Sequence, residues 1–540
     1  MAPPVPPHLA VERAGTLTAL LDDLARRHGD ATALWYCGLA VTYRGLAAES
    51  RRVARGLHDL GVRAGDRVAL WLPNTPAWIA AFFACARLGA IALSTNTRFR
   101  SAEMSDIIGR SGTSFLLYWP GFRGIDFDAI LGAVDAPSLR GLRGLIAYRE
   151  DDVPVGSRGP GGLPVHAYRT LAACAPYEGD HAAPDQGCVM FTTSGTTRAP
   201  KFVLHHQAAI VTHLHDVARG FGYAAPGSVG LSVLPLCGVY GFATALAPFA
   251  AGVPFPMTSR FGVPETLELI RRHRVTNTNL TGDMIAGLLA EARDADAFST
   301  IRFCGCGTGS TIHAAPGEAK GLRITGLYGS SELQALFSHQ DEVSAIESRS
   351  QGGGRPVSPL TSVRARNVET GAILPHGESG MLEIRAPSQL AEYFGNPDAT
   401  AEAFTDDGYF RTGDLGCTVD DGRFVYLARM GDSLRLSGFL VSPVQIEAVV
   451  LEYPGIAACQ VVGVDGAGGV KPYAFYLRHD HAAVDEAALS AFCRERMARY
   501  KVPARFVRLD AFPVTNGANG TKVQKARLRE MAASLTGGAA

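Results

Sequence analysis

The chain is 540 residues long, and hydrophobic residues make up 47% of it while charged residues make up 19%. At roughly 150 residues per domain, about three or four folding units are expected, with enough apolar residues for large cores rather than a disordered chain. Because 51 Lys and Arg residues balance 51 Asp and Glu residues, no overall charge attracts nucleic acid or an acidic membrane, and any anion site must be local.

The N-terminus and the apolar segments lack the marks of secretion or membrane insertion. The opening Met1 to Pro7 has neither the basic start nor the apolar core of a secretory signal. The longest apolar run, Ala77 to Ala92, is interrupted by Arg87 and is shorter than the roughly 18 residues that span a bilayer. The 10 cysteines include no CxxC pair, which fits a reducing compartment. We predict a soluble, cytoplasmic protein with no membrane span and no nucleic-acid partner.

Apolar spacing predicts alternating helices and strands in the first part of the chain. Residues 17–28 carry leucines at helical spacing, and residues 46–60 repeat that pattern after a short strand. The apolar run 67–71 lies between Gly65-Asp66 and Pro73-Asn74, which suits a buried parallel strand leading into a helix over 77–88. This alternation predicts an α/β fold whose sheets are covered by helices.

The segment Phe191 to Lys201, with the sequence FTTSGTTRAPK, is the strongest candidate for a binding loop. Its small residues let backbone N–H groups converge on an anion, its hydroxyls add donors, and its lysine adds a positive charge. It lacks the order of a common P-loop, so an ordinary P-loop NTPase is not implied. A hydroxyl-rich surface turn is the alternative interpretation. The candidate phosphate ligands are Thr193, Ser194, Gly195, Thr196, Thr197 and Lys201.

Further segments follow in a fixed order. They are Tyr328-Gly329-Ser330-Ser331-Glu332, Gly408 to Asp414, Arg429 to Asp432 leading to Ser437-Gly438-Phe439, and Gly520-Thr521-Lys522-Val523-Gln524-Lys525. Together with the loop, these segments resemble the core motifs of the adenylate-forming (AMP-binding) superfamily, which comprises acyl-CoA synthetases, adenylation domains of peptide synthetases, and luciferases. The resemblance runs from about Thr16 to about Arg529.

The resemblance implies both an architecture and a reaction. It implies a large N-terminal adenylation domain of several subdomains, residues 1–430, and a small mobile α+β C-terminal lid domain, residues 431–540. The implied reaction is ATP-dependent activation of a carboxylic acid to an acyl-adenylate with pyrophosphate release, followed by transfer to CoA as a thioester. ATP, Mg²⁺ and CoA are therefore the expected cofactors, because charge that develops on phosphorus oxygens requires positioned cations and donors.

Roles in the nucleotide site follow from the resemblance, residue by residue. The 194–201 loop would hold the β- and γ-phosphates, and Ser331 would contact the α-phosphate. Glu332 would hold Mg²⁺, since a carboxylate oxygen suits that hard ion. The ring of Tyr328 would pack against adenine, and its neighbours Gly329 and Ser330 belong to the same nucleotide-binding segment. The Gly305-Cys306-Gly307 turn would line the adenine and acyl sites.

The second group of roles belongs to the C-terminal motifs. Asp414 would accept hydrogen bonds from both ribose hydroxyls, and Arg429 would add a contact to the same sugar. Lys522 would reach the reacting carboxylate and phosphate during adenylation, while the Gly438 segment would later line a pantetheine tunnel. Read without the family, Asp414 is a turn aspartate and Lys522 a solvated basic turn residue.

Four positions depart from the usual family pattern. Arg198 and Phe202 stand where the phosphate loop usually has glycine, Gly238 stands where many relatives have histidine, and Gly431 occupies the hinge position that is usually Asp or Lys. These departures leave two alternatives beside CoA ligation. The chain could pass its activated group to an amine or a carrier protein, or it could activate a small oxyacid such as nitrite.

Overall fold

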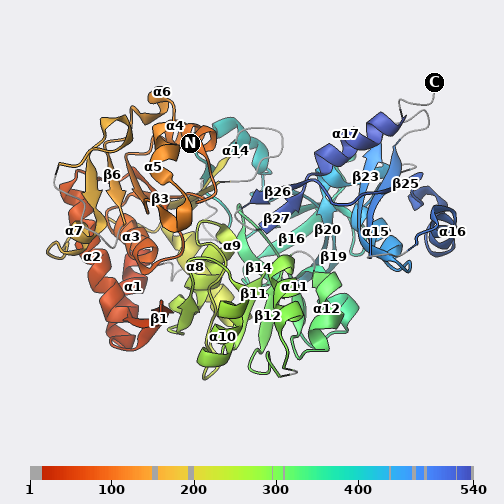
Figure 1. The fold of residues 1–540 in the computed structure, drawn as a ribbon, viewed down its shortest axis with the longest axis horizontal. Coiled ribbons are helices and arrows are strands. Elements are labelled where there is room, and N and C mark those ends of the chain that lie inside the picture. The colour runs from red at the N-terminus through yellow and green to blue at the C-terminus, as the bar shows by residue number, and fades with distance from the viewer. Residues whose placement is uncertain are drawn as a thin grey trace. The chain divides into compact units, whose positions relative to one another are not determined.

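The computed structural model describes residues 15–148, 156–192, 200–294, 296–307, 310–436, 439–464, 470–479, 483–517 and 520–536 (Figure 1). The chain forms two compact units, the first made of residues 1–361 and 385–408 and the second of residues 362–384 and 409–540. The predicted mixed α/β architecture is confirmed. The domain boundary predicted after residue 430 lies inside the second unit and stays a prediction.

The first unit contains an eight-stranded sheet in the order β18-β9-β8-β4-β3-β5-β6-β7. Strands β3 to β8 run parallel where they pair, whereas β9 and β18 are antiparallel to their neighbours. Their bounds are β3 (Arg67–Trp71), β4 (Ile91–Ser94), β5 (Phe115–Tyr118), β6 (Gly144–Ala147), β7 (Val165–Ala167), β8 (Gly187–Thr192), β9 (Phe202–His206) and β18 (Glu392–Tyr393).

Local sequence explains the helices that cover this sheet. The predicted helix over 17–28 is α1 (Leu17–His28), and it begins there because the Thr16 side chain accepts a hydrogen bond from the backbone N–H of Ala19. The other predicted helices are α2 (Tyr43–Asp59) and α3 (Pro76–Arg87). The remaining helices of this half are α4 (Ser101–Ser111), α5 (Phe127–Gly132), α6 (Ala136–Leu139) and α7 (Tyr168–Ala172).

A second set of strands in the first unit carries another part of the site. Strands β11 (Asn277–Leu280), β12 (Phe303–Cys306) and β13 (Ile324–Ser330) are parallel, and β14 (Gln334–His339) and β15 (Gly352–Pro356) continue them in antiparallel fashion. The associated helices are α8 (Gln207–Gly220), α9 (Val239–Ala250), α10 (Val263–His273), α11 (Gly282–Glu291), α12 (Ser310–Glu318), α13 (Ile346–Arg349) and α14 (Pro397–Ala403). A small sheet joins β1 (Thr32–Tyr36), β2 (Leu39–Thr42) and β10 (Phe255–Met257).

The second unit combines mostly antiparallel strands with three α-helices among its described residues. Strands β19 (Phe410–Asp420) and β20 (Arg423–Arg429) pair with each other, and β17 (Gly380–Arg385) pairs with β19. The other elements are β16 (Ser362–Arg366), β21 (Leu434–Leu436), β22 (Phe439–Val441), α15 (Pro443–Leu451), β23 (Ile456–Val464), β24 (Lys471–Arg478), α16 (Glu486–Arg496), β25 (Arg505–Arg508), β26 (Val514–Gly517), β27 (Gly520–Val523) and α17 (Lys525–Thr536). Strands β24 and β25 pair in parallel. Within the described residues, no helix has the length and apolar character needed to cross a membrane.

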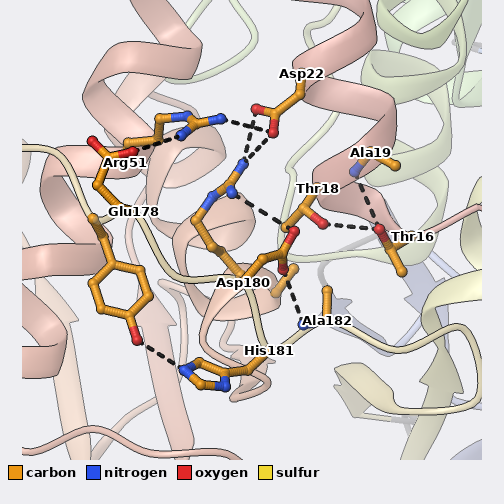
Figure 2. A network of polar contacts seen from close by, with 12 residues as sticks. Thr16, Thr18, Ala19, Asp22, Arg51, Glu178, Asp180, His181 and Ala182 are labelled. Carbon is orange, nitrogen blue, oxygen red and sulfur yellow. Dashed lines mark hydrogen bonds and ion pairs between the residues drawn. The ribbon is translucent and has the colours of Figure 1, made fainter.

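A buried polar network fixes the segment that leads into β8 (Figure 2). Arg87, at the end of α3, is only 3% exposed and donates to both carboxylate oxygens of Asp22 at 2.8 and 2.9 Å. Arg51 donates to the same carboxylate at 2.9 Å, and Asp180 lies 3.7 Å from the Arg87 guanidinium. The backbone N–H of His181 donates to the Arg87 carbonyl at 2.8 Å. Asp22 thus joins α1 to α2 and α3, and Arg87 joins these helices to the chain just before β8.

Loss of this shared carboxylate should destabilise the first unit. In the variant Asp22→Ala, Arg87 stays buried without its main partner, so we expect the free energy of unfolding to fall by about 3 kcal/mol. The neighbouring Asp23→Ala is a matched control, because both aspartates are 33% exposed and the ion pairs of Asp23 in the described part of the chain are with the exposed Arg26 and Arg27. Its effect should stay within about 0.5 kcal/mol. Urea denaturation of both variants tests this difference, and equal effects would contradict it.

Candidate functional site

The predicted phosphate loop connects β8 to β9. Residues 193–199, which include the candidates Thr193, Ser194, Gly195, Thr196 and Thr197 together with Arg198, lie outside the described residues. The base of the loop is described: Thr192 pairs with Phe202 and Phe191 pairs with Val203. The loop therefore leaves a parallel strand at its carboxyl end, which is the edge where α/β sheets bind ligands.

Phe202, one of the four departures, has a packing role at this base. Its side chain is 2% exposed, and the guanidinium carbon of Arg110 lies 4.7 Å from the centre of its ring. The same guanidinium donates to the carbonyl of Pro200 at 2.7 Å. The end of α4 thus holds the last residues of the loop in place through both a cation–π contact and a hydrogen bond.

The segment from Tyr328 to Glu332 forms one arm and the turn of a hairpin. Tyr328 is 5% exposed and lies on β13, where its ring meets Phe337 edge to face. Ser331 and Glu332 lie in the turn between β13 and β14, and the Ser330 hydroxyl accepts from the backbone N–H of Leu333 at 3.2 Å. Glycine is required at 329, because a Cβ there would lie 2.7 Å from the Cα of Ala335.

Tyr393 brings the loop lysine and the hairpin carboxylate to one place. Its hydroxyl donates to Glu332 Oε1 at 3.0 Å, and Lys201 Nζ lies 4.2 Å from the centre of its ring. The backbone N–H of Leu390 donates to the Glu332 carbonyl at 2.6 Å. Sequence reasoning missed Tyr393, whose sole signal is an aromatic residue shortly before a Gly-Asn-Pro turn.

This arrangement is compatible with the magnesium role predicted for Glu332. A carboxylate that is oriented through one oxygen by Tyr393 can present its other oxygen to the ion. Within the described residues, no group of three or more His, Cys, Asp and Glu side chains is placed to hold a metal. Mg²⁺ does not need such a cage, because it is commonly held by one or two carboxylates together with substrate phosphates and water.

Two fully buried histidines contact the hairpin from the neighbouring elements. His205 on β9 and His213 on α8 are 0% and 1% exposed. The Nε2 atom of His205 lies 2.8 Å from the carbonyl oxygen of Ser331, and that of His213 lies 2.7 Å from the carbonyl oxygen of Ala335. A carbonyl oxygen can only accept, so both rings carry their proton on Nε2. Burial lowers the pKa of each ring to about 4, which keeps both neutral.

Gly305 is explained by close packing on β12. A Cβ at this position would lie 2.2 Å from Asn279 Oδ1 and 2.6 Å from a methyl carbon of Leu327. The buried Tyr240 hydroxyl donates to the carbonyls of Gly305 and Leu280 at 3.3 and 3.1 Å. Gly238 directly precedes α9, which carries Tyr240. The described contacts of Gly305 are therefore those of a tightly packed strand, and its predicted ligand contact stays a prediction.

In the second unit, Asp414 and Arg429 are brought together as a cross-strand pair of β19 and β20. Arg429 Nε lies 3.1 Å from Asp414 Oδ1, and the two side chains are 53% and 1% exposed. The backbone N–H of Asp414 donates to the Thr412 hydroxyl at 3.0 Å. Gly413 has a φ of 68°, which glycine adopts without strain. A buried carboxylate therefore stands beside a half-exposed cation.

Of the remaining candidates in the second unit, one is described by its backbone position and the other lies outside the described residues. Lys522 is on β27, opposite Thr515 of β26, and Gly438 is outside the described residues. At the hinge position, Arg529 donates to the Gly431 carbonyl at 3.1 Å and to Asp432 at 2.7 Å. The hinge segment of this chain is therefore held by its aspartate and the last helix, while Gly431 itself has no side chain to contribute.

Comparison with known proteins identifies the family. The AMP-binding enzyme model matches residues 21–394, and the AMP-binding enzyme C-terminal domain matches residues 445–518. The chain belongs to the AMP-binding enzyme family.

Among curated relatives, the sulfoacetate–CoA ligase of Cupriavidus necator is 29% identical over 498 residues, covering 91% of this chain and 92% of that protein. Triostin synthetase I of Streptomyces triostinicus is 29% identical over 558 residues, covering 98% of each chain. Among solved structures, ATP-bound MatB of Rhodopseudomonas palustris has a TM-score of 0.82 at 23% identity, covering 96% of this chain and 99% of that one. That likeness shows the fold.

The two buried histidines should make stability fall in mild acid. Between pH about 6.5, the pKa of an unfolded histidine, and about 4, the unfolded chain binds protons that the folded chain does not, so stability is lost as pH falls through this window. His213→Gln removes one such group, and its pH slope of unfolding free energy should be smaller by up to about 1.4 kcal/mol per pH unit, with the largest difference toward pH 5. Chemical denaturation at pH 7, 6 and 5 measures both slopes, and identical slopes would refute the buried neutral state.

Proposed function

We propose that the chain activates a carboxylic acid with ATP and then transfers the acyl group to CoA as a thioester. The proposal rests on the family match across both domains. It is supported by the hairpin that carries Ser331 and Glu332, which Tyr393 joins to Lys201 at the base of the loop. Relatives named as CoA ligases cover more than nine tenths of this chain.

The reaction has two steps that share one acyl site. The acid's carboxylate oxygen attacks the α-phosphorus of ATP, pyrophosphate leaves, and a mixed anhydride with AMP remains. The CoA sulfur, as thiolate, then attacks the acyl carbon, and AMP leaves. Negative charge builds on phosphorus oxygens in the first step, so positioned donors and cations lower its barrier.

Residue roles in the first unit follow this chemistry. Lys201 and the loop residues 193–197 hold the β- and γ-phosphates, and Ser331 contacts the α-phosphate. Glu332 holds Mg²⁺, which when bound neutralises phosphate charge. Tyr328, with its neighbours Gly329 and Ser330, forms the adenine side, and Gly305 lies near the acyl and adenine groups.

Residue roles in the second unit complete the proposal. Asp414 accepts from the ribose hydroxyls, a role that suits a buried carboxylate already oriented by Arg429. Arg429 is half exposed and can also reach the sugar. Lys522 bridges the substrate carboxylate and the α-phosphate during adenylation, and the Gly438 segment guides pantetheine during thioester formation.

Lys522 should separate the two half-reactions. We expect Lys522→Ala to lower the rate of adenylation at least about a hundredfold, because it removes the charge that bridges the two reactants. Thioester formation from supplied acyl-AMP should stay within about threefold of the unsubstituted enzyme. Acid-dependent pyrophosphate exchange measures the first step and CoA consumption the second. Equal loss of both steps would contradict a role confined to adenylation.

The overall reaction is tested by ATP turnover over a panel of acids, with and without CoA. We expect acid-dependent formation of AMP and pyrophosphate, with sustained AMP release that requires CoA. The panel should include aryl, dicarboxylic and fatty acids as well as nitrite. Release of ADP and inorganic phosphate would contradict the proposal for every acid.

A second acceptor class is favoured by one comparison. Triostin synthetase I covers 98% of this chain, and its name does not specify a CoA ester. Transfer to an amine or to a carrier protein is therefore the second candidate. In the same assay, AMP release that depends on an added amine or carrier protein, rather than on CoA, would favour it.

We also propose a cytoplasmic location. All ten cysteines, each of which is a described residue, are free thiols. Such cysteine usage is typical of chains that fold and work in a reducing compartment.

A further inference from the structure

The turn that bears Ser331 and Glu332 is followed by an unusual backbone. Gln334 and Leu336, on β14, have φ values of 63° and 62°. The left-handed region is unfavourable for residues with a side chain, and bulky residues adopt it only where their surroundings require it. The pairing of β13 with β14 also shifts register between Tyr328 and Ser330. The backbone preferences of these residues therefore do not explain the shape of this hairpin, which must depend on contacts with other parts of the chain.

Three side chains hold that shape through long-range hydrogen bonds, most of which involve the continuous stretch of residues 205–213. His205 donates to the Ser331 carbonyl, and His213 donates to the Ala335 carbonyl, which lies between the two left-handed residues. The Gln334 amide donates to the carbonyls of Ala209 and Ser388 at 3.2 and 3.3 Å. Residues 205, 209 and 213 belong to the end of β9 and to α8. The hairpin is thus attached at both ends of its turn.

The direction of the Ser331 carbonyl affects the position of Glu332, because this carbonyl belongs to the peptide that joins the two residues. A peptide unit is planar, so the direction of its carbonyl fixes the direction in which the next residue leaves. A donor to this carbonyl therefore sets the orientation of the Glu332 backbone, while Tyr393 and the N–H of Leu390 fix its carboxylate and its own carbonyl.

We propose that His205 and His213 are positioning residues for the nucleotide step: through their Nε2–H donors to the Ser331 and Ala335 carbonyls, they hold Ser331 and Glu332 in the geometry that binds MgATP. Both residues are fully buried, so the rings act through the backbone of the hairpin. This inference rests on the proposed function, and it adds a requirement that no motif of the sequence shows. The acylation of CoA does not need the β- and γ-phosphates or their metal, and of the contacts that the two rings position it keeps the one between Ser331 and the α-phosphate, so it should be less sensitive to the two rings than MgATP binding is.

The test compares variants that keep the donor with variants that lose it. Glutamine places an amide N–H near the position of Nε2, whereas asparagine is one methylene too short and leucine has no donor. For His205 and His213 separately, we expect →Leu and →Asn to raise the Kd for MgATP about tenfold, in line with loss of one hydrogen bond that leaves a buried carbonyl unsatisfied. The →Gln variants should stay within about twofold. Titration calorimetry with MgATP gives these constants without requiring turnover.

A kinetic split distinguishes positioning from general damage. In pyrophosphate exchange, the donor-deficient variants should show a raised KM for MgATP, while the rate of thioester formation from supplied acyl-AMP, which keeps only the α-phosphate for Ser331 to contact, should change by a smaller factor. His215→Leu is the control, because His215 lies two residues from His213 on α8 and its electrostatic neighbours, such as Arg219 and Asp216, are not in the hairpin. It should change neither value.

Two outcomes would overturn the inference. One is that glutamine impairs MgATP binding as much as leucine does, which would show that ring shape rather than the donor matters. The other is that both half-reactions fall together with the melting temperature, which would assign the histidines to stability alone. If a leucine variant does not fold, the Kd for MgATP is compared between the asparagine and glutamine variants instead. Because MgATP binding is measured directly, a failure to find the acid or CoA activity would not decide this test.

Discussion

The pairing of β9 with both of its neighbours is the constraint on which the described part of the site in the first unit depends. One edge of β9 pairs with β8, which closes the base of the phosphate loop at Thr192 and Phe202, and the other edge pairs with β18, which carries Tyr393. Lys201 directly precedes the strand, and His205 near its end reaches the Ser331 carbonyl. A slip of β9 by one residue would turn every one of its side chains to the opposite face of the sheet. The phosphate loop, Tyr393 and the β13–β14 hairpin would then no longer be held next to one another.

Sequence reasoning was sufficient wherever the signal is local. The bounds of α1 match the prediction at both ends because the leucine spacing and the Thr16 cap act within a few residues. The strand 67–71 was likewise predicted from its own apolar run. Motif residues such as Glu332 and Asp414 could be named as candidates because short, ordered segments identify the family, and their roles stay predictions.

Contacts between distant residues could not be read from the sequence. His205 and Ser331 are 126 positions apart, His213 and Ala335 are 122 apart, and Tyr393 and Glu332 are 61 apart. A histidine on an apolar strand gives no sign of which carbonyl it will meet. The same holds for Phe202, which reads as a departure from the family pattern until Arg110 is seen over its ring. Register, rather than composition, decides these contacts.

The anchoring of Phe202 and Pro200 by Arg110 also bears on how the nucleotide is captured. A loop must lose backbone freedom when it closes around an anion, and that loss weakens binding. Here the trailing end of the segment is already immobilised by the last turn of α4, so fewer rotatable bonds remain to be frozen. If the loop binds phosphate as proposed, this anchoring reduces the conformational entropy that the loop must lose when ATP binds.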